Sequence, residues 1–276
     1  MRYSEAVVTA PPGSASFEAE DIARLSRPSL RLAFEPGPAA PPLEDVAAAL
    51  GRSRPELVTV AGQLPAARGE RLLRLSQRPI TDLERERSRT RLVAGLFWLL
   101  VYELRPDLWD RLARLEEISP DLLQALDCQG RLVVEVAAGT GRLSCFLAAS
   151  ASLLVAIEPV PSLRARLRQR LQGRACVVAA VGHRLPLADG AADLVVSCAS
   201  FGPDFPIGGE PVVAELERVV RIGGRVAVVG PEQPGWWDER GYELHSFAPP
   251  EPVAQPDLEA FFGPLHPPSE LALKTL

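Results

Sequence analysis

The stretch RLVVEVAAGTGRLS at 131–144 decides the fold, because an apolar run ends there in a tight glycine turn that opens a helical pattern. Glycines at 139 and 141 let the backbone approach a ligand closely, and the start of the following helix offers N–H groups without a helical partner. Strand, glycine turn and helix in this order predict the first unit of an α/β sheet with a ligand site at the turn. Taken alone, the pattern is a weak indication.

The chain beyond this turn continues to alternate apolar strands with helical stretches up to residue 230. The expected strands are 131–137, 153–158, 176–181, 193–199 and 225–230. Such a β-α-β-α-β series is typical of a mostly parallel sheet with helices on both faces. The sequence therefore predicts a Rossmann-like α/β core.

The helix expected at 162–172 has a pattern that separates a face toward the sheet from a face toward solvent. Leucine recurs every fourth residue, at 163, 167 and 171, which places these side chains on one face toward the sheet. The arginines of the same segment alternate with them, and we expect these to form a solvated face; they are Arg164, Arg166, Arg168 and Arg170.

A second feature strengthens the prediction of a ligand site. Glu158 ends the second expected strand, 23 residues after Glu135, where a carboxylate can accept hydrogen bonds from both ribose hydroxyls of a nucleoside. The turn reads G-T-G-R-L-S from Gly139, so Ser144 stands where a dinucleotide fingerprint has its third glycine. The pattern thus favours a nucleoside cofactor over NAD and leaves a nucleotide-dependent oxidoreductase as a distant alternative.

At these residues the segment 131–230 resembles the class I S-adenosylmethionine (SAM) dependent methyltransferases. It is most similar to the small-molecule branch that includes the quinone-biosynthesis C-methyltransferases. The family's first motif, an acid followed by alternating glycines, corresponds to the run from Glu135 to Gly141, with Ala137 in place of one glycine. An alanine at this position still permits a tight turn if its φ stays negative.

The other motifs that carry the resemblance are AIEPV at 156–160, the Leu-Pro stretch at 179–201 and the helix, Gly-Gly turn and strand at 215–230. The resemblance implies SAM as the cofactor, with Glu135 facing its methionine ammonium and Glu158 accepting the ribose diol. Four residues before Leu185 the family often has an aspartate for adenine, and this chain has Val181. The predicted cofactor-binding set is Glu135, Ala137, Gly139, Thr140, Gly141, Glu158, Pro159, Val181, Gly182, His183 and Ser200.

The acceptor side is expected just after the fourth and fifth strands, where ligands bind in open α/β sheets. Candidates there are Ser200, Phe201, Asp204, Trp236, Trp237 and His245. Asp204 and His245 are weak candidates for a proton acceptor, and an exposed loop histidine is the simpler interpretation of the second. The two tryptophans either pack on the sheet or form an acceptor wall. In-line transfer onto a small, apolar or aromatic molecule needs alignment more than acid–base chemistry.

Four regions are expected along the chain. Residues 1–81 are a partly irregular extension rich in Pro and Gly, and 82–130 are helices that cover or border the cofactor cleft. The core is 131–248, followed by a Pro-rich tail at 249–276. The last residues, 269–276, suit a terminal strand, but proline-rich breaks leave that edge of the sheet open to being incomplete.

Composition excludes several classes of protein. The net charge is −5, which gives no footprint for nucleic acid, and the longest apolar run, 92–102, is too short for a membrane span and suits a buried helix. We expect a cytoplasmic location. The four cysteines lack metal-site or disulfide-scaffold spacing and suit reduced packing residues, and the three histidines are too scattered to nominate a metal.

The sequence therefore predicts a SAM-dependent methyltransferase acting on a small molecule. A non-catalytic SAM-binding or methyltransferase-fold interaction protein is the alternative, motivated by Val181, the short tail and the long N-terminal region. Measurement of SAM binding and then of acceptor turnover distinguishes the enzyme from the non-catalytic alternative.

Overall fold

The computed structural model of this 276-residue chain describes residues 21, 24–26, 29, 32, 95, 97–203, 209–251 and 254–276. The chain divides into two compact units, one of residues 1–105 with 256–263 and the other of 106–255 with 264–276. The second unit contains the sheet and the predicted site. Most of the expected N-terminal extension lies outside the described residues.

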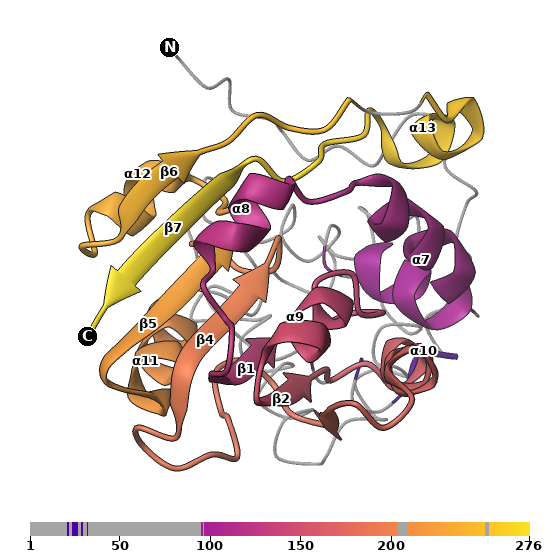
Figure 1. The fold of residues 1–276 in the computed structure, drawn as a ribbon. Coiled ribbons are helices and arrows are strands. Elements are labelled where there is room, and N and C mark those ends of the chain that lie inside the picture. Colours follow the sequence, from indigo (N-terminus) through magenta and orange to yellow (C-terminus); the bar gives the residue numbers. More distant parts are fainter. Residues whose placement is uncertain are drawn as a thin grey trace, which may run out of the picture. The chain divides into compact units, whose positions relative to one another are not determined.

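Within the described residues, seven strands form one sheet in the order β3-β2-β1-β4-β5-β7-β6 (Figure 1). Their bounds are β1 Leu132–Val136, β2 Leu153–Ile157, β3 Cys176–Val178, β4 Ala192–Cys198, β5 Val220–Val229, β6 Glu243–Ser246 and β7 Glu270–Thr275. Strands β1 to β5 pair in parallel, and β7 is antiparallel to both of its neighbours. The carboxyl ends of the five parallel strands therefore meet at one edge of the sheet.

Helices cover both faces of this sheet (Figure 1). The helices of the second unit are α7 Pro106–Leu115, α8 Pro120–Ala125, α9 Ser144–Ser150, α10 Pro161–Leu171, α11 Glu210–Val219 and α12 Pro234–Asp238. The first unit contains the helix α13 Pro256–Phe262. Residues of α8, α9 and α10 form one core with the sheet, and residues of α11 and α12 form the other. The expected contacts of Leu163, Leu167 and Leu171 are confirmed, since all three are buried.

The Rossmann-like α/β fold is confirmed, and all five core strands overlap the segments that the sequence predicts. Strand β3 ends at Val178, before the expected 181, and β5 begins at Val220, so the expected Gly-Gly turn lies within this strand. The terminal strand is also confirmed, as β7. The sequence left open whether the sheet is incomplete at this edge. The structure shows that β6 pairs with β7 and forms an antiparallel pair there. All four residues of β6 are exposed. Its sequence ELHS lacks the regular alternation of apolar and polar residues that predicts a strand.

In the first unit, the described part of the long apolar run is helical, at 95 and 97–104. Leu99, Leu100 and Val101 are buried there, which agrees with the expected buried helix. Trp98 stacks on Phe262 of α13, with ring centroids 5.8 Å apart. No helix in the part of the chain that the structure describes is long and apolar enough to cross a membrane.

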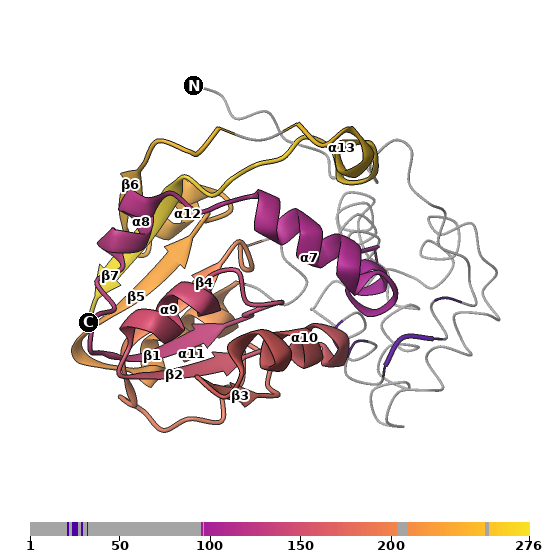
Figure 2. The same ribbon diagram turned by 45° about the vertical axis from the view of Figure 1, so that its right-hand side comes forward.

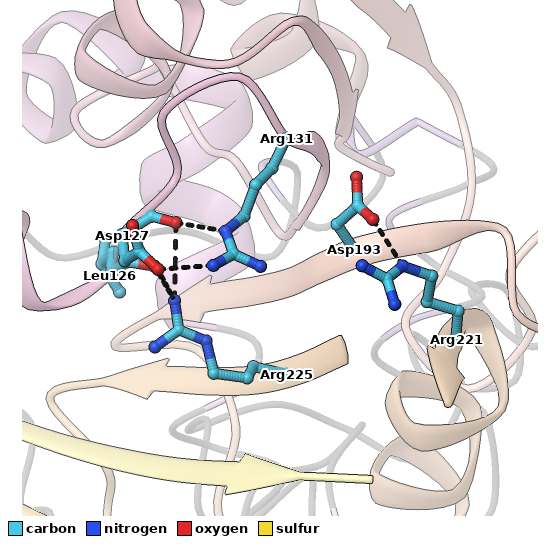
Figure 3. A network of polar contacts seen from close by, with 6 residues as sticks. All are labelled: Leu126, Asp127, Arg131, Asp193, Arg221 and Arg225. Atoms are coloured by element: carbon cyan, nitrogen blue, oxygen red, sulfur yellow. Dashed lines mark hydrogen bonds and ion pairs between the residues drawn. The ribbon is translucent and has the colours of Figure 1, made fainter. Parts of the chain in front are cut away.

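Two carboxylates tie together the amino ends of the central strands (Figure 3). Asp127, which follows α8, accepts hydrogen bonds from Arg131 and from Arg225 of β5. Asp193 accepts the backbone N–H of Leu132 at 2.8 Å and Nε of Arg221 at 2.5 Å, which holds the pKa of its carboxyl below the usual range. Asp193 therefore joins the starts of β1, β4 and β5 through hydrogen bonds rather than apolar packing.

We expect Asp193→Ala to lower the free energy of unfolding by about 1–2 kcal/mol, because the Leu132 N–H loses its acceptor. Asp193→Asn keeps an acceptor and should lose less. Asp189→Ala is the control, since the Asp189 side chain is 83% exposed in its ion pair with Arg218 and should change stability by no more than about 0.5 kcal/mol.

Urea unfolding measures these differences. The lowered pKa of Asp193 stabilises the fold above the carboxyl's unfolded pKa of about 4, and this contribution is lost as the pH falls. The cost of Asp193→Ala should therefore shrink in acid. A loss no larger than that of Asp189→Ala at pH 7 would contradict the assignment.

Candidate functional site

The turn between β1 and α9 is built from left-handed backbone. Gly139 and Gly141 have φ of 58° and 97°, and a Cβ at Gly141 would lie 2.9 Å from Leu167 Cδ1 of α10. Glycine is therefore required at 141 both for conformation and for space. Ala137 has φ of 61°, so the condition of a negative φ is not met and the turn forms in left-handed backbone. The turn holds an L-residue in a conformation that costs about 1–2 kcal/mol.

Glu158 joins this turn to the end of β2. Its Oε2 accepts the backbone N–H of Gly139 at 2.8 Å, and its Oε1 accepts that of Val160 at 2.8 Å. A carboxylate has about four acceptor sites, which allows one side chain to serve several donors. The structure thus brings together Glu158 and Gly139, two residues of the predicted cofactor set.

Glu135 lies in β1 with 2% of its surface exposed. The Ser144 hydroxyl at the start of α9 donates to its Oε2 at 2.5 Å. Burial, and to a lesser degree the negative charge of Glu158, raises the pKa of the Glu135 carboxyl to about 8. A buried carboxyl of this kind ionises readily only beside a cation, which agrees with the predicted role of facing an ammonium.

Thr140 gives an independent test of whether the turn fits a ligand. The residue is 1% exposed, and its Oγ1 has no hydrogen-bond partner among the described residues. Buried hydroxyls are normally satisfied, so an unpaired one beside glycine backbone and a carboxylate fits a polar ligand at the turn. The residues present therefore fit the nucleoside and amino acid groups of SAM.

The segment expected to recognise adenine follows β3. Val181 forms an isolated bridge with Arg184, and His183 between them is half-buried. A Cβ at Gly182 would lie 2.8 Å from the ring of Phe201, so this glycine admits the aromatic ring directly against its backbone. Phe201 is 6% exposed and belongs to the core, which places a residue of the expected acceptor side beside the expected adenine segment.

The remaining acceptor candidates that are described lie on different elements, although Trp237 and the half-buried Trp236 share a core cluster with Phe201. Ser200 donates its hydroxyl to the carbonyl of Cys198, and Asp204 lies outside the described residues. Trp237 is fully buried and packs against Tyr242, so it is a core residue. Trp236 is covered by the Arg240 guanidinium, 3.7 Å from the ring centroid.

His245 lies on the exposed edge strand β6, three strands from β4 in the sheet. It is therefore strand rather than loop, and the expectation of a loop histidine was wrong. Its nearest carboxylate is that of Glu243 on the same strand, at 3.9 Å.

Sequence reasoning missed the polar residues of α7, which lies beside α9 and α10 (Figures 1 and 2). Asp110 of this helix accepts hydrogen bonds from Arg170, so the arginines of α10 do not all face water as expected. At the other end of the glycine turn, Arg142 donates to Glu116 and to the sulfur of Cys198. The one signal in the sequence for the Asp110–Arg170 pair is Asp110 itself, an acidic residue on a face of α7 that is otherwise apolar.

Comparison with known proteins finds a family model that matches part of this chain. Residues 134–228 match the family model described as methyltransferase domain. The ubiquinone/menaquinone biosynthesis C-methyltransferase of Rubrivivax gelatinosus is 32% identical over 120 residues, 43% of this chain and 46% of that protein. The demethylmenaquinone methyltransferase of a Parafrankia species is 35% identical over 126 residues, 39% of this chain and 49% of that protein. The chain thus spans about half the length of these relatives.

Solved structures also match. A SAM-dependent methyltransferase from Aquifex aeolicus aligns at 16% identity with a TM-score of 0.40, covering 55% of this chain and 79% of that one.

The left-handed φ of Ala137 generates a prediction about stability. We expect Ala137→Gly to raise the free energy of unfolding by about 0.5–1 kcal/mol, because relief of the strained φ exceeds the entropy that glycine adds to the unfolded chain. Ala148→Gly in the middle of α9 is the matched control and should cost about 1 kcal/mol. Urea unfolding of both variants decides, and equal losses would show that Ala137 is not strained.

Proposed function

We propose that this chain, whose residues 134–228 belong to the methyltransferase domain family, transfers a methyl group from SAM to a small-molecule acceptor. The observation that carries the proposal is the Glu158 carboxylate bound to the N–H of Gly139 at 2.8 Å. This contact puts an acceptor for ribose hydroxyls directly beside the glycine turn, which is what a nucleoside bound at the carboxyl ends of β1 and β2 requires.

In this proposal the residues divide the cofactor between them. Glu158 and Pro159 hold the ribose side, while Glu135 and the Thr140 hydroxyl hold the amino acid side. Adenine is recognised by Val181, Gly182 and His183. Because Val181 offers no side-chain acceptor, the backbone of this segment supplies the adenine contacts.

Bound SAM supplies a methyl group on a positively charged sulfur, which is already electrophilic. The protein's own residues then act by orientation and by exclusion of water. The buried core around Phe201 and Val136 supports a dry floor next to the turn. No acid–base pair is needed for this role, and Asp204 and His245 stay weak candidates for accepting a proton.

The acceptor is proposed as a small molecule because two relatives are named for quinone biosynthesis. Its apolar or aromatic character rests on Phe201 and on the absence of a basic excess, since the net charge is −5. A cytoplasmic location likewise stays a prediction.

Calorimetry with SAM and S-adenosylhomocysteine tests the cofactor assignment. Glu158→Ala should weaken binding by about 1.5–3 kcal/mol, because the ribose hydroxyls lose a charged acceptor. Glu239→Gln is the control, since the Glu239 side chain is 78% exposed and the residue directly follows α12, outside the predicted cofactor-binding set. Absence of binding by the folded wild-type protein, or unchanged affinity in Glu158→Ala, would overturn the assignment.

Incubation of the protein with a metabolite extract and SAM carrying a labelled methyl group tests the activity. Mass spectrometry should find a labelled small molecule. Binding of SAM with no labelled product would favour the non-catalytic alternative.

The raised pKa of Glu135 predicts a proton linkage. With a pKa of about 8 the carboxyl is mostly protonated at pH 7, and an ammonium placed beside it favours the ionised form. SAM binding should therefore release up to about one proton, and affinity should rise between pH 6 and pH 7, where the ligand's own amino group, with an ordinary pKa of about 8, stays charged.

Calorimetry in buffers with different ionisation enthalpies measures the released proton. Glu135→Gln should release none and should show a flat pH dependence. An identical proton release in wild type and Glu135→Gln would place the titrating group elsewhere.

A further inference from the structure

Arg170 of α10 contacts the glycine turn and helix α7 at once. Its Nη1 donates to the carbonyl of Thr140 at 2.8 Å, and its Nη2 lies 2.7 and 2.8 Å from the two carboxylate oxygens of Asp110. Asp110 is 5% exposed, although it belongs to a helix that otherwise buries leucine and alanine. One guanidinium therefore bridges a turn carbonyl and a buried carboxylate.

The glycine turn lies directly against this arginine. A Cβ at Gly141 would come within 3.4 Å of Arg170 Cδ as well as 2.9 Å of Leu167 Cδ1. The same peptide segment carries the Thr140 hydroxyl, whose Oγ1 has no partner among the described residues. A shift of the Thr140 carbonyl would thus move both the unpaired hydroxyl and the Gly141 backbone.

A second arginine–carboxylate pair lies just after the last residue of α7. Arg142, just after the turn, donates Nη1 to the carbonyl of Glu116 at 3.1 Å and to its carboxylate at 3.3 Å. Gly139 of the same turn also lies close to α7, since a Cβ there would be 3.6 Å from the indole nitrogen of Trp109. Helix α7 is therefore held against the turn by one arginine–carboxylate pair at its middle and by a second just beyond its end.

The part-buried pair of Arg170 and Asp110 is not explained by stability alone, because the cost of desolvating the charges, above all that of Asp110, offsets part of their attraction. Arginine differs from lysine in that two separate nitrogens serve two acceptors in a fixed plane. Arg170 uses this property, since different nitrogens serve Thr140 and Asp110.

We propose that Arg170 is a positioning residue for the cofactor site and that Asp110 orients it, so that docking of α7 and binding of the cofactor stabilise each other. The proposal rests on the proposed function for the identity of the ligand. The coupling of α7 to the turn is independent of the proposed function. Because coupling between two equilibria is reciprocal, each event must favour the other by the same factor.

The ligand experiment is calorimetry of the full chain with S-adenosylhomocysteine. Arg170→Lys, which keeps the charge but carries one nitrogen, should weaken binding about tenfold, and Asp110→Asn by a similar factor. Arg168→Lys, an exposed position on the same helix, should stay within about twofold of wild type.

A destabilised control separates positioning from general loss of structure. Asp193→Ala weakens the fold at the opposite ends of the strands and should leave affinity unchanged, even where its loss of unfolding free energy equals that of Arg170→Lys. Loss of affinity in Asp193→Ala equal to that in Arg170→Lys would overturn the proposal, and so would wild-type affinity in both Arg170→Lys and Asp110→Asn.

Amide hydrogen exchange without ligand tests the coupling independently of SAM. Peptides spanning 138–145 and 106–115 should both exchange faster in Arg170→Lys and in Asp110→Asn than in Arg168→Lys. If wild type binds no SAM but both peptides respond, the proposed function fails and the positioning role stands. Unchanged exchange in both peptides would refute the positioning role, whatever the protein binds.

Discussion

The site depends on one constraint, which is that the chain must turn sharply in left-handed backbone where β1 ends. Glu158 holds this turn by accepting the N–H of Gly139, and the cost of burying that carboxylate is offset by a second backbone N–H, from Val160. The end of β1 is thereby joined to the end of β2 by the hydrogen bond from Gly139 to Glu158 as well as by the sheet. A site built on strand ends in this way is more rigid than one built on free loops.

Most of the core was predictable because it depends on local periodicity. The leucines of α10 and the apolar strands β1 to β5 follow patterns of helix and strand burial that a single sequence displays. Strand β6 was not predictable, since it is exposed at every residue and its place in the sheet is set by pairing with the distant strand β7. Pairing partners distant in sequence leave no periodic signal in an exposed segment.

The site was predictable only where a residue type is dictated by backbone or ligand chemistry. Gly141 is required by its φ and by the nearness of Leu167, and the sequence shows it plainly. Ala137 shows the opposite case, because nothing in the residue itself reveals a left-handed φ. Arg170 resembles its solvated neighbours in sequence, and only the fold brings it to Asp110, 60 residues earlier. Tertiary ion pairs of this kind carry no local signature.

The two outer strands of the sheet have a consequence for the behaviour of the chain in concentrated solution. On one side the sheet ends in β3 with three residues, and on the other in β6 with four, including Glu243. Unpaired strand edges are templates for adding strands from other molecules, and short, charged edges are poor templates. The long, apolar strands that would aggregate most readily, such as β4 and β5, lie inside the sheet. The fold therefore protects itself against edge-to-edge aggregation by where it places its shortest strands.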